Sequence, residues 1–447
     1  MRNTIETRSV KSNGSLPMAD AEVCIVGLGY VGLTLAVALA DSGMRVVGCD
    51  ASPAVVEGVA RAEPPFWEKG LPERLREFRP EQFAVTATLP DPLPETVVIC
   101  VGTPLDESHS ANLGALEAVV EVLASKVTPD TLVILRSTVP IGTSRKLVLP
   151  ALQRRVEEVL LAFAPERTIQ GQALEELRNL PQVVGGLNEA ATDKAAALFE
   201  RLAPQVVRVS SLEAAEMIKL INNAHTDLIY GFGNEVALIA EAIGLDAGEL
   251  IRGANLNYPR PDLSRPGFVG GSCLTKDPYI LISSAEAHGY SAPMVTAARQ
   301  VNENLPDHVA DRVLAVLRER GDPADAKVLV SGVAYKGYPE TDDVRGGAAE
   351  RLGARLGPKV GTVVAHDFVV GPERIAGLGL EPVAGLEEGF KDADAALILN
   401  DHSRYRSLDV PGLVATMRTP IVFDAWGVLE DQLRGHDGVT YLRLGIG

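Results

Sequence analysis

The residues best suited to chemistry lie in the segment GFVGGSCLTKDPYIL, in which Cys273 follows two glycines and a serine. The residues after the cysteine are predicted to form a helix. A thiol at the start of a helix gains thiolate character from the helix dipole, and a nearby lysine increases it. Lys276 and Asp277 follow closely and can lie on the cysteine's side of the first turn. An inert cysteine buried in a turn would have the same local sequence, so this segment alone does not establish a nucleophile.

A second motif, at residues 27–32, has the spacing GxGxxG within VCIVGLGYVGLTLAVALA. Gly27 permits a tight turn, Gly29 lets a pyrophosphate approach the backbone, and Gly32 lets the helix pack closely on the preceding strand. Asp50 ends the next predicted strand, about twenty residues further on. A carboxylate there accepts hydrogen bonds from an adenosine ribose and repels a 2′-phosphate, which favours NAD over NADP. FAD and a glycine-rich turn without a ligand are the alternatives.

Together the two motifs point to one type of reaction. A dinucleotide enzyme with a nucleophilic cysteine can trap an aldehyde as a thiohemiacetal, remove a hydride and leave a thioester. Water then converts the thioester to an acid. We therefore expect the chain to bind NAD and to use Cys273 covalently.

The elements that must position these motifs are short apolar strands that alternate with helices. Val, Ile and Leu dominate the strand segments without polar alternation, as in parallel sheets that are covered on both faces. We expect strands in VCIVGLG, RVVGCD, TVVICVG, TLVILRST and VLLAFAPE, and again from about residue 326 in KVLVSGVAY, TVVAHD, AALILN, PIVFDAW and GVTYLRL.

Between these two α/β parts, residues 211–243 contain no proline and have apolar residues near helical spacing. We expect one long helix, or two helices that break near Gly231 and Gly233. Residues 255–271 are rich in proline and glycine and are expected to form a long loop that carries function. The predicted fold class is α/β, with two doubly wound Rossmann-like domains joined by a long central helix.

Composition limits the class of protein. With 447 residues, 46% apolar and 23% charged, the chain should fold into two or three globular domains. Its net charge of −17 disfavours nucleic acid and anionic membranes as partners. We find neither a signal-peptide pattern nor a run of about 18 apolar residues, so we expect a cytoplasmic protein that does not cross a membrane.

The histidines and cysteines carry further expectations. The seven histidines are dispersed, so we expect no metal site. The four cysteines are scattered and lack CxxC spacing, which indicates a reducing compartment. Cys24, Cys49 and Cys100 lie in or at the end of strand segments and are expected to be buried.

Seven motifs in matching order make the chain resemble the nucleotide-sugar 6-dehydrogenases, the family typified by UDP-glucose dehydrogenase. The resemblance extends from about Val23 to the end of the chain. The motifs are GLGYVGL, ICVGTPLDE (99–107), RSTVPIGT (136–143), PERTIQG (165–171), EMIKLINN (216–223), GGSCLTKDP (270–278) and AYKGYPETDDVRG (334–346). The resemblance implies that the C6 hydroxyl of a nucleotide-linked hexose is oxidised twice by NAD, to the uronic acid, through a thioester on Cys273.

The resemblance also implies a domain organisation. We expect a flexible arm at 1–20, an NAD-binding Rossmann domain at 21–210 and a central helical domain with the cysteine loop at 211–325. A C-terminal Rossmann-like domain at 326–447 would bind the nucleotide sugar. A homodimer that forms through the central helix is implied as well.

Six catalytic residues follow from the resemblance. They comprise the nucleophile, an oxyanion-stabilising Lys/Asn pair on one helix face, a Thr/Asp pair that holds a water, and an acid that assists thioester hydrolysis. In that order they are Cys273, Lys219, Asn223, Thr138, Asp277 and Glu166. Two alternatives stay open, namely that Asp277 caps its helix and that Glu166 forms a structural ion pair.

Binding residues are implied in the same way. The expected NAD contacts are Gly27, Gly29, Tyr30, Val31, Gly32, Asp50, Thr103, Thr138, Lys276 and Arg345. The expected substrate contacts are Glu166, Arg167, Lys219, Asn223, Tyr258, Arg260, Gly270 and Lys336, with Arg265 and Arg345 as further candidates for the diphosphate.

Several features bear on the sugar. The UDP-glucose branch often has a second glutamate four residues after Glu166, where this chain has Gln170. PERTIQG and DPY resemble the N-acetylhexosamine branch, whereas GGSC resembles the glucose branch. UDP-glucose or TDP-glucose is the main prediction, and a UDP-N-acetylhexosamine is the alternative. Further alternatives are a two-electron β-hydroxyacid dehydrogenase, which has no use for GGSC, and a non-catalytic NAD-binding protein, which should lack a catalytic residue.

Overall fold

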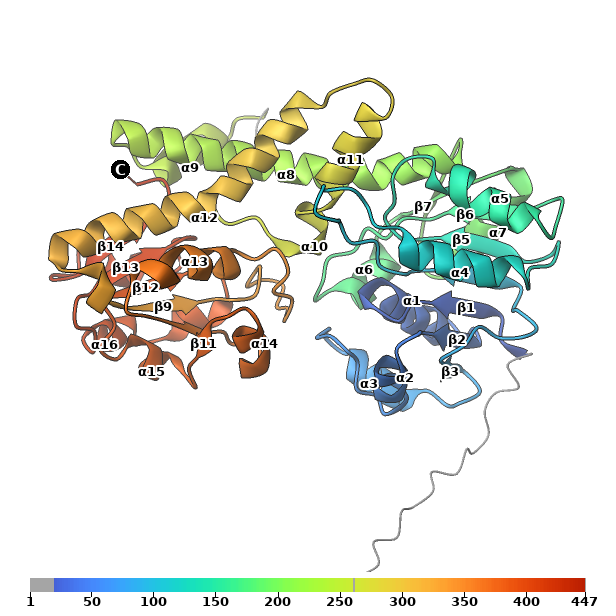
Figure 1. The fold of residues 1–447 in the computed structure, drawn as a ribbon, viewed down its shortest axis with the longest axis horizontal. Helices are drawn as coiled ribbons and strands as arrows, with labels where there is room; N and C mark the ends of the chain where they lie inside the picture. The colour runs from blue at the N-terminus through green and yellow to red at the C-terminus, as the bar shows by residue number, and fades with distance from the viewer. Residues whose placement is uncertain (1–19, 260–261, 447) are drawn as a thin grey trace, which may run out of the picture. The chain divides into compact units, whose positions relative to one another are not determined.

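A computed structural model describes residues 20–259 and 262–446 of the chain (Figure 1). The predicted arm, apart from its last residue, and the predicted substrate contact Arg260 lie outside the described residues. The described residues form two compact units. The first comprises 20–103, 113–168 and 172–216, and the second comprises 104–112, 169–171, 217–259 and 262–446.

The first unit is a doubly wound α/β domain built on an eight-stranded sheet with the order β3-β2-β1-β4-β5-β6-β7-β8 (Figure 1). Neighbouring strands are parallel, except that β6 and β7 are antiparallel. The strands are β1 (Val23–Val26), β2 (Val46–Cys49), β3 (Phe83–Thr86), β4 (Thr96–Ile99), β5 (Leu132–Leu135), β6 (Leu160–Phe163), β7 (Gln182–Gly186) and β8 (Val206–Val209).

Five of these strands, β1, β2, β4, β5 and β6, confirm the predicted strands of this part of the chain. β3, β7 and β8 are additional. β8 has two exposed residues at its centre, and β7 ends in two glycines that resemble a turn. A Cβ atom on Gly185 would lie 2.2 Å from the backbone oxygen of Ser211, so this glycine permits a close backbone approach inside the strand.

The helices of the first unit contact either the strands of the sheet or one another. They are α1 (Tyr30–Asp41), α2 (Pro53–Ala60), α3 (Leu71–Glu77), α4 (Gly114–Ala124), the π-helix Ser144–Val148, α5 (Leu149–Gln153), α6 (Ala173–Asn179) and α7 (Glu189–Phe199). α1 is buried from Gly32 to Ala40, because it lies in the core beside β1 and β2 and also contacts α6.

The second unit contains a six-stranded, fully parallel sheet with the order β11-β10-β9-β12-β13-β14. The strands are β9 (Lys327–Ser331), β10 (Thr362–His366), β11 (Glu381–Pro382), β12 (Ala395–Ile398), β13 (Ile421–Asp424) and β14 (Thr440–Arg443). All five predicted strands are confirmed. The two-residue edge strand β11 is too short to be predicted from periodicity.

The segment between the sheets forms one continuous helix, α8 (Leu212–Ile243). Of the two alternatives, the single helix is therefore confirmed. Gly231 and Gly233 do not break it. A Cβ atom at these positions would lie 3.0 Å from Ala298 and 2.5 Å from the backbone oxygen of Ser264, so both glycines permit close packing of α8 against its neighbours.

The remaining helices belong to the second unit. They are α9 (Ala247–Asn255), α10 (Gly271–Leu274), α11 (Asp277–Glu286), α12 (Pro293–Arg320), α13 (Ala348–Leu356), α14 (Pro372–Gly377), α15 (Leu386–Phe390), α16 (Val410–Val414) and α17 (Glu430–Leu433). α12 packs on α13 and joins one core with β9 and the end of α8. Its buried face repeats every four residues, at Leu305, Val309, Val313 and Leu317.

Candidate functional site

The glycine motif forms a narrow turn between β1 and α1. Gly27 has φ +92°, a value that favours glycine, and a Cβ atom on Gly32 would lie 1.8 Å from the backbone oxygen of Gly27. Gly29 precedes α1, and a Cβ atom there would meet nothing within 4 Å. The open space at Gly29 and the free N–H groups at the start of α1 suit a pyrophosphate. The turn therefore fits a dinucleotide.

Asp50 lies at the end of β2, next to this turn. Its Oδ2 accepts a hydrogen bond from the Leu28 amide at 2.7 Å, and its Oδ1 accepts one from the Ser52 amide at 2.9 Å. The carboxylate thus holds the glycine turn in place. Each of its oxygens has a further lone pair with which it can accept a hydrogen bond from a ribose hydroxyl.

Tyr30 and Val31 open α1 and are both half-buried. The Tyr30 hydroxyl donates a hydrogen bond to Glu68, and its ring lies 4.8 Å from that of Phe66. Glu68 is 3% exposed and also accepts from the Ala173 amide at 2.8 Å. Tyr30 therefore anchors the 66–68 segment beside the glycine turn.

Thr103 and Thr138 follow β4 and β5, which are neighbours in the sheet. The Thr103 hydroxyl donates to the Thr138 backbone oxygen at 2.5 Å, so the two strand ends are tied together. The carboxyl ends of parallel strands are where ligands bind in this architecture. The structure thus brings these two predicted residues together.

Glu166 forms a structural ion pair, which was the open alternative for this residue. Its Oε2 lies 2.6 Å from Nη2 of Arg136, and Arg136 is 2% exposed. Its Oε1 accepts from the amides of Arg167 and Thr168 at 2.6 and 2.8 Å. Arg167 itself is exposed and donates to the Pro181 backbone oxygen at 3.3 Å.

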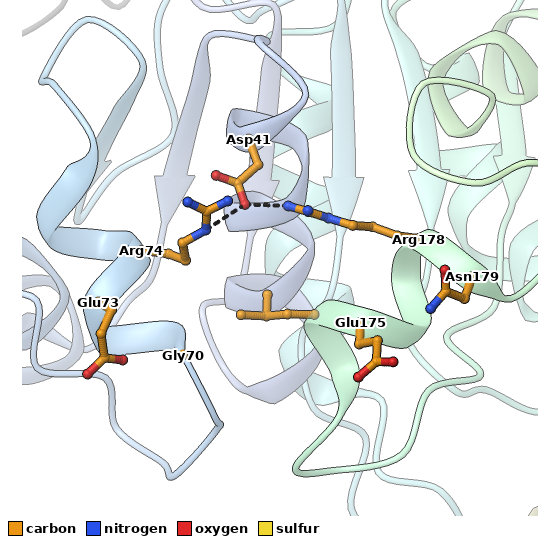
Figure 2. A pocket seen from close by; sticks show the side chains of 8 residues that line it. Asp41, Gly70, Glu73, Arg74, Glu175, Arg178 and Asn179 are labelled. Carbon is orange, nitrogen blue, oxygen red and sulfur yellow. Dashed lines mark hydrogen bonds and ion pairs between the residues drawn. The ribbon is translucent and has the colours of Figure 1, made fainter.

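A hollow in the same unit contains none of the predicted site residues (Figure 2). Arg74 and Arg178 approach Asp41 from opposite sides, at 3.2 and 2.5 Å, so both guanidinium groups already have a carboxylate partner. Asp41 ends α1, whereas the glycine turn lies at the other end of that twelve-residue helix, about 18 Å away. The ion pairs join α1, α3 and α6.

Cys273 is exposed, and the other three cysteines are buried, as expected. The prediction that Cys273 opens one continuous helix is wrong. It is the third residue of the single turn α10, and α11 begins only at Asp277. Pro278 causes the break, because it lacks an N–H and its ring excludes the carbonyl of Leu274 from a helical position.

Two of the predicted catalytic residues are in contact in the second unit, and a third lies on the same helix as one of them. The Asn223 amide, on α8, donates to Oδ2 of Asp277 at 2.5 Å. Asp277 is fully buried, and its Oδ1 lies 3.7 Å from Nζ of Lys276. Lys219 is 7% exposed and lies one helical turn before Asn223, and no carboxylate of the described chain forms an ion pair with it.

The cysteine turn packs against the loop that follows β9. The Gly271 amide donates to the Arg345 backbone oxygen at 3.0 Å. A Cβ atom on Gly270 would lie 2.6 Å from the Gly346 oxygen, and one on Gly271 would lie 2.8 Å from the Tyr335 ring. The glycines are therefore required for this close approach. Burial raises the pKa of the Tyr335 hydroxyl, and the nearby Cys273 thiolate raises it further.

The predicted phosphate contacts Lys336 and Arg345 already have partners. Arg345 binds Asp343 through two hydrogen bonds of 2.8 and 2.7 Å, and Lys336 donates to the Gln170 backbone oxygen at 2.7 Å. Burial disfavours the charged form of Asp343, yet the Arg345 guanidinium holds the pKa of this carboxyl below its ordinary value. A diphosphate must share or exchange these contacts.

The remaining predicted substrate contacts belong to the loop before Cys273. Tyr258 and Arg265 are exposed, and Arg260 lies outside the described residues. Within residues 20–259 and 262–446, no group of three His, Cys, Asp or Glu side chains is arranged to hold a metal ion. None of the helices in the described part of the chain combines the length and apolar character that a membrane crossing requires.

Sequence reasoning missed three residues beside the predicted ones. Arg136 binds Glu166, and Asp343 binds Arg345. The Tyr335 ring lies against the cysteine turn. Each lies inside a quoted motif, RSTVPIGT or AYKGYPETDDVRG, but its own partner could not be read from the sequence.

The fold and the glycine turn define a Rossmann-type dinucleotide-binding protein. Three family models then match successive parts of the chain, namely the NAD binding domain (residues 21–203), the central domain (213–304) and the UDP binding domain (329–431) of the UDP-glucose/GDP-mannose dehydrogenase family. The chain belongs to this family, and it is an NAD-dependent nucleotide-sugar dehydrogenase.

Individual relatives refine the comparison. The UDP-N-acetyl-D-mannosamine dehydrogenase of Pyrococcus horikoshii is 31% identical over 419 residues, which cover 92% of this chain and 96% of the relative. The solved structure of UDP-D-ManNAc dehydrogenase from that organism has a TM-score of 0.86 at 29% identity and covers 95% of this chain and 99% of that one. A UDP-glucose dehydrogenase structure from Pyrobaculum islandicum has a TM-score of 0.84 at 27% identity and covers 97% and 99%.

These findings confirm the predicted family, fold class and cofactor. For the sugar they favour the alternative prediction, an N-acetylhexosamine, over the main prediction of UDP-glucose or TDP-glucose.

Proposed function

We propose that this protein is a UDP-N-acetylhexosamine 6-dehydrogenase that oxidises the C6 alcohol to the carboxylate with two equivalents of NAD. One observation carries the proposal: the exposed Cys273 lies on a short turn that leads into Asp277, and Asp277 is hydrogen-bonded to Asn223. A nucleophilic thiol distinguishes an enzyme that oxidises its substrate twice from one that oxidises it once. Only the second oxidation, from aldehyde to acid, needs a group that accepts the acyl carbon.

The residues of the first unit suit the cofactor. Gly29 and the start of α1 would hold the pyrophosphate, and Asp50 would hold the adenosine ribose. NAD, when bound, accepts a hydride from the substrate carbon in each of the two oxidations. Each oxidation also releases a proton. We assign the hydroxyl proton of the first oxidation to Lys219, or to a water held by Asp277 and Thr138.

The covalent steps belong to Cys273. Its thiolate adds to the C6 aldehyde to form a thiohemiacetal, which loses a hydride from C6 to become a thioester. Water then breaks the C–S bond, so that the acid and the free thiol are released. Lys219 and Asn223 are the proposed donors to the oxyanion, and one well-placed donor is worth about 3 kcal/mol. For Glu166 we propose a positioning role, since Arg136 already binds its carboxylate.

The sugar assignment has two supports. Relatives named for UDP-N-acetyl-D-mannosamine and NDP-N-acetyl-D-galactosaminuronic acid match over more than nine-tenths of this chain. In addition, the Gln170 amide donates to Oδ2 of Asp343 at 3.0 Å. The glutamate that the UDP-glucose branch often has in this place would set a second carboxylate against Asp343. UDP-glucose remains the second candidate, because of GGSC and the Pyrobaculum islandicum relative.

A substrate panel tests the assignment. NADH formation is measured with UDP-N-acetylmannosamine, UDP-N-acetylglucosamine, UDP-N-acetylgalactosamine, UDP-glucose and TDP-glucose. We expect kcat/KM for one N-acetylhexosamine to exceed that for both glucose nucleotides by about tenfold or more. A higher value for UDP-glucose or TDP-glucose would establish the glucose nucleotide as the substrate. Oxidation of none of the five would overturn the proposal.

We also propose a homodimer that forms through α8. Exposed apolar side chains recur at near-helical spacing along one face of this helix, at Met217, Ile221, Ile229, Phe232, Ile239 and Ile243. A stripe of this length on a soluble protein is typical of a surface that packs against another chain. A second copy is the simplest occupant, because an isologous contact lets the same stripe pack against itself.

A further inference from the structure

The turn that carries Cys273 leaves one backbone group without a partner in its own helix. α10 ends at Leu274, whose carbonyl would, in a continuous helix, accept from the amide four residues later. That residue is Pro278, which has no amide hydrogen. A donor from another element must therefore satisfy the Leu274 carbonyl.

Arg299 of α12 is this donor. Its Nη1 donates to the Leu274 backbone oxygen at 2.6 Å and to Oδ1 of Asp227, on α8, at 2.6 Å. Arg299 is 1% exposed and Asp227 is 0% exposed. A buried ion pair is no more stabilising than apolar residues of the same volume. The geometry that this pair imposes on the cysteine turn is therefore its most evident contribution.

Neighbouring amides fix the pair and the other end of the cysteine loop. Asn302 donates to Oδ1 and to the backbone oxygen of Asp227, at 2.9 and 3.0 Å. Its own oxygen accepts from Asn234 at 2.9 Å, and Asn234 accepts from the Gly267 amide at 2.8 Å. The loop is thus held before Cys273 at Gly267 and after it at Leu274.

A second branch attaches the start of α11 to the same arginine. Nε of Arg299 lies 3.4 Å from Oε1 of Glu303, and the Tyr279 hydroxyl donates to Glu303 at 2.8 Å. The Tyr279 ring stacks on His109, with centroids 4.2 Å apart and planes at 12°. The guanidinium is therefore restrained by contacts at both Nη1 and Nε.

We propose that Arg299, held by Asp227, is a positioning residue for the thioester chemistry of Cys273. By fixing the carbonyl next to the cysteine, it sets where the thiol meets the C6 aldehyde. This inference rests on the proposed double oxidation. The oxidation of alcohol to aldehyde does not use the thiol, whereas the oxidation of the aldehyde does. A displaced turn should therefore slow the second oxidation selectively, because covalent attack needs close alignment.

The test uses the full chain and the variants Arg299→Met and Arg299→Lys. Arg312→Met is the matched control, because Arg312 also joins α12 to α8, through Glu241 at 2.9 Å, without touching the cysteine turn. Two rates are measured with the nucleotide-sugar 6-aldehyde, namely its oxidation with NAD and its reduction to the alcohol with NADH. We expect Arg299→Met to lower the oxidation rate about tenfold more than the reduction rate. Arg312→Met should change both rates by the same factor.

Arg299→Lys covers the case in which Arg299→Met does not fold. It keeps the buried charge but loses the planar fork, so the same selective loss should appear to a smaller extent. Alkylation of Cys273 by iodoacetamide is a readout that does not depend on turnover, since the other three cysteines are buried. Its rate should change in both Arg299 variants and not in Arg312→Met.

Equal loss of both half-reactions, together with an unchanged alkylation rate, would overturn the positioning role. The proposed function fails separately. If the wild-type protein oxidises no nucleotide sugar, the double oxidation is wrong, and the alkylation rates still decide whether Arg299 positions the thiol.

Discussion

At the scale of the residue, the cysteines differ in their surroundings. Burial is the main cause that raises the pKa of Cys49 to about 11 and that of Cys100 to about 12, so both thiols stay protonated at neutral pH. Cys24 is buried in β1. Cys273 is the exposed one and lies on a turn held from both sides. It is therefore the thiol available for covalent chemistry.

Replacing this thiol should stop the second oxidation. Cys273→Ser and Cys273→Ala are expected to form acid at less than about 0.1% of the wild-type rate, because no thioester can form. NAD affinity, measured by calorimetry, should persist. Cys24→Ala, which alters a buried strand residue, should still form the acid. Normal acid formation by both Cys273 variants would rule out the thioester.

The choice of cofactor should depend on Asp50. Asp50→Ala is expected to weaken NAD binding by about tenfold, since hydrogen bonds to a charged group are lost. Asp50→Asn keeps an acceptor for the Leu28 amide but removes the charge, so it should mainly narrow the preference for NAD over NADP. Fluorescence titration of both dinucleotides against the wild type and the two variants gives the six dissociation constants. An unchanged NAD affinity in Asp50→Ala would refute the ribose contact.

Asp343 should make the stability of the loop that follows β9 sensitive to acid. Because its folded pKa is lowered, its ionised form adds stability above the unfolded value of about 3.9, and this is lost as pH falls through the folded pKa. Urea unfolding of Asp343→Asn should therefore show a smaller loss of stability below about pH 4 than the wild type. Glu373→Gln, at an exposed position, is the control. Identical acid profiles for wild type and Asp343→Asn would contradict the pairing.

At the scale of the element, strands with an unbroken apolar run were predictable and interrupted ones were not. The sequence predicts β1 and β5 because they are apolar throughout and buried, and β4 because three of its four residues are. β7 escapes because Gly185 resembles a turn, although the glycine serves a close contact with Ser211. The break between α10 and α11 depends on Pro278, whose effect on the cysteine turn was not predicted.

The exposed face of α8 should hold two chains together. Phe232→Glu and Ile239→Glu place charges in the middle of this stripe and are expected to halve the mass in solution, because buried unpaired charges are costly. Val122→Glu, at an exposed apolar position of α4, should leave the mass unchanged. Light scattering after size-exclusion chromatography measures the mass. A wild-type monomer, or variants that remain dimers, would exclude this interface.

At the scale of the whole molecule, the family was predictable because seven motifs follow one another along the chain in the same order as in that family. The contacts that hold the site were not predictable, because they join residues far apart in the sequence. Arg299 lies 72 residues from Asp227 and 25 from Leu274. The sequence also left the sugar open, because Gln170 and PERTIQG favour the N-acetylhexosamine branch whereas GGSC favours the glucose branch.

The most direct test of the account is the number of NADH molecules formed per nucleotide sugar consumed. The sugar is limiting, NAD is in excess, and the product is analysed for carboxylate. We predict two NADH and one acid per sugar, because Cys273 carries the aldehyde on to the thioester. One NADH per sugar with an aldehyde product would contradict the thioester mechanism and would make this protein a two-electron dehydrogenase.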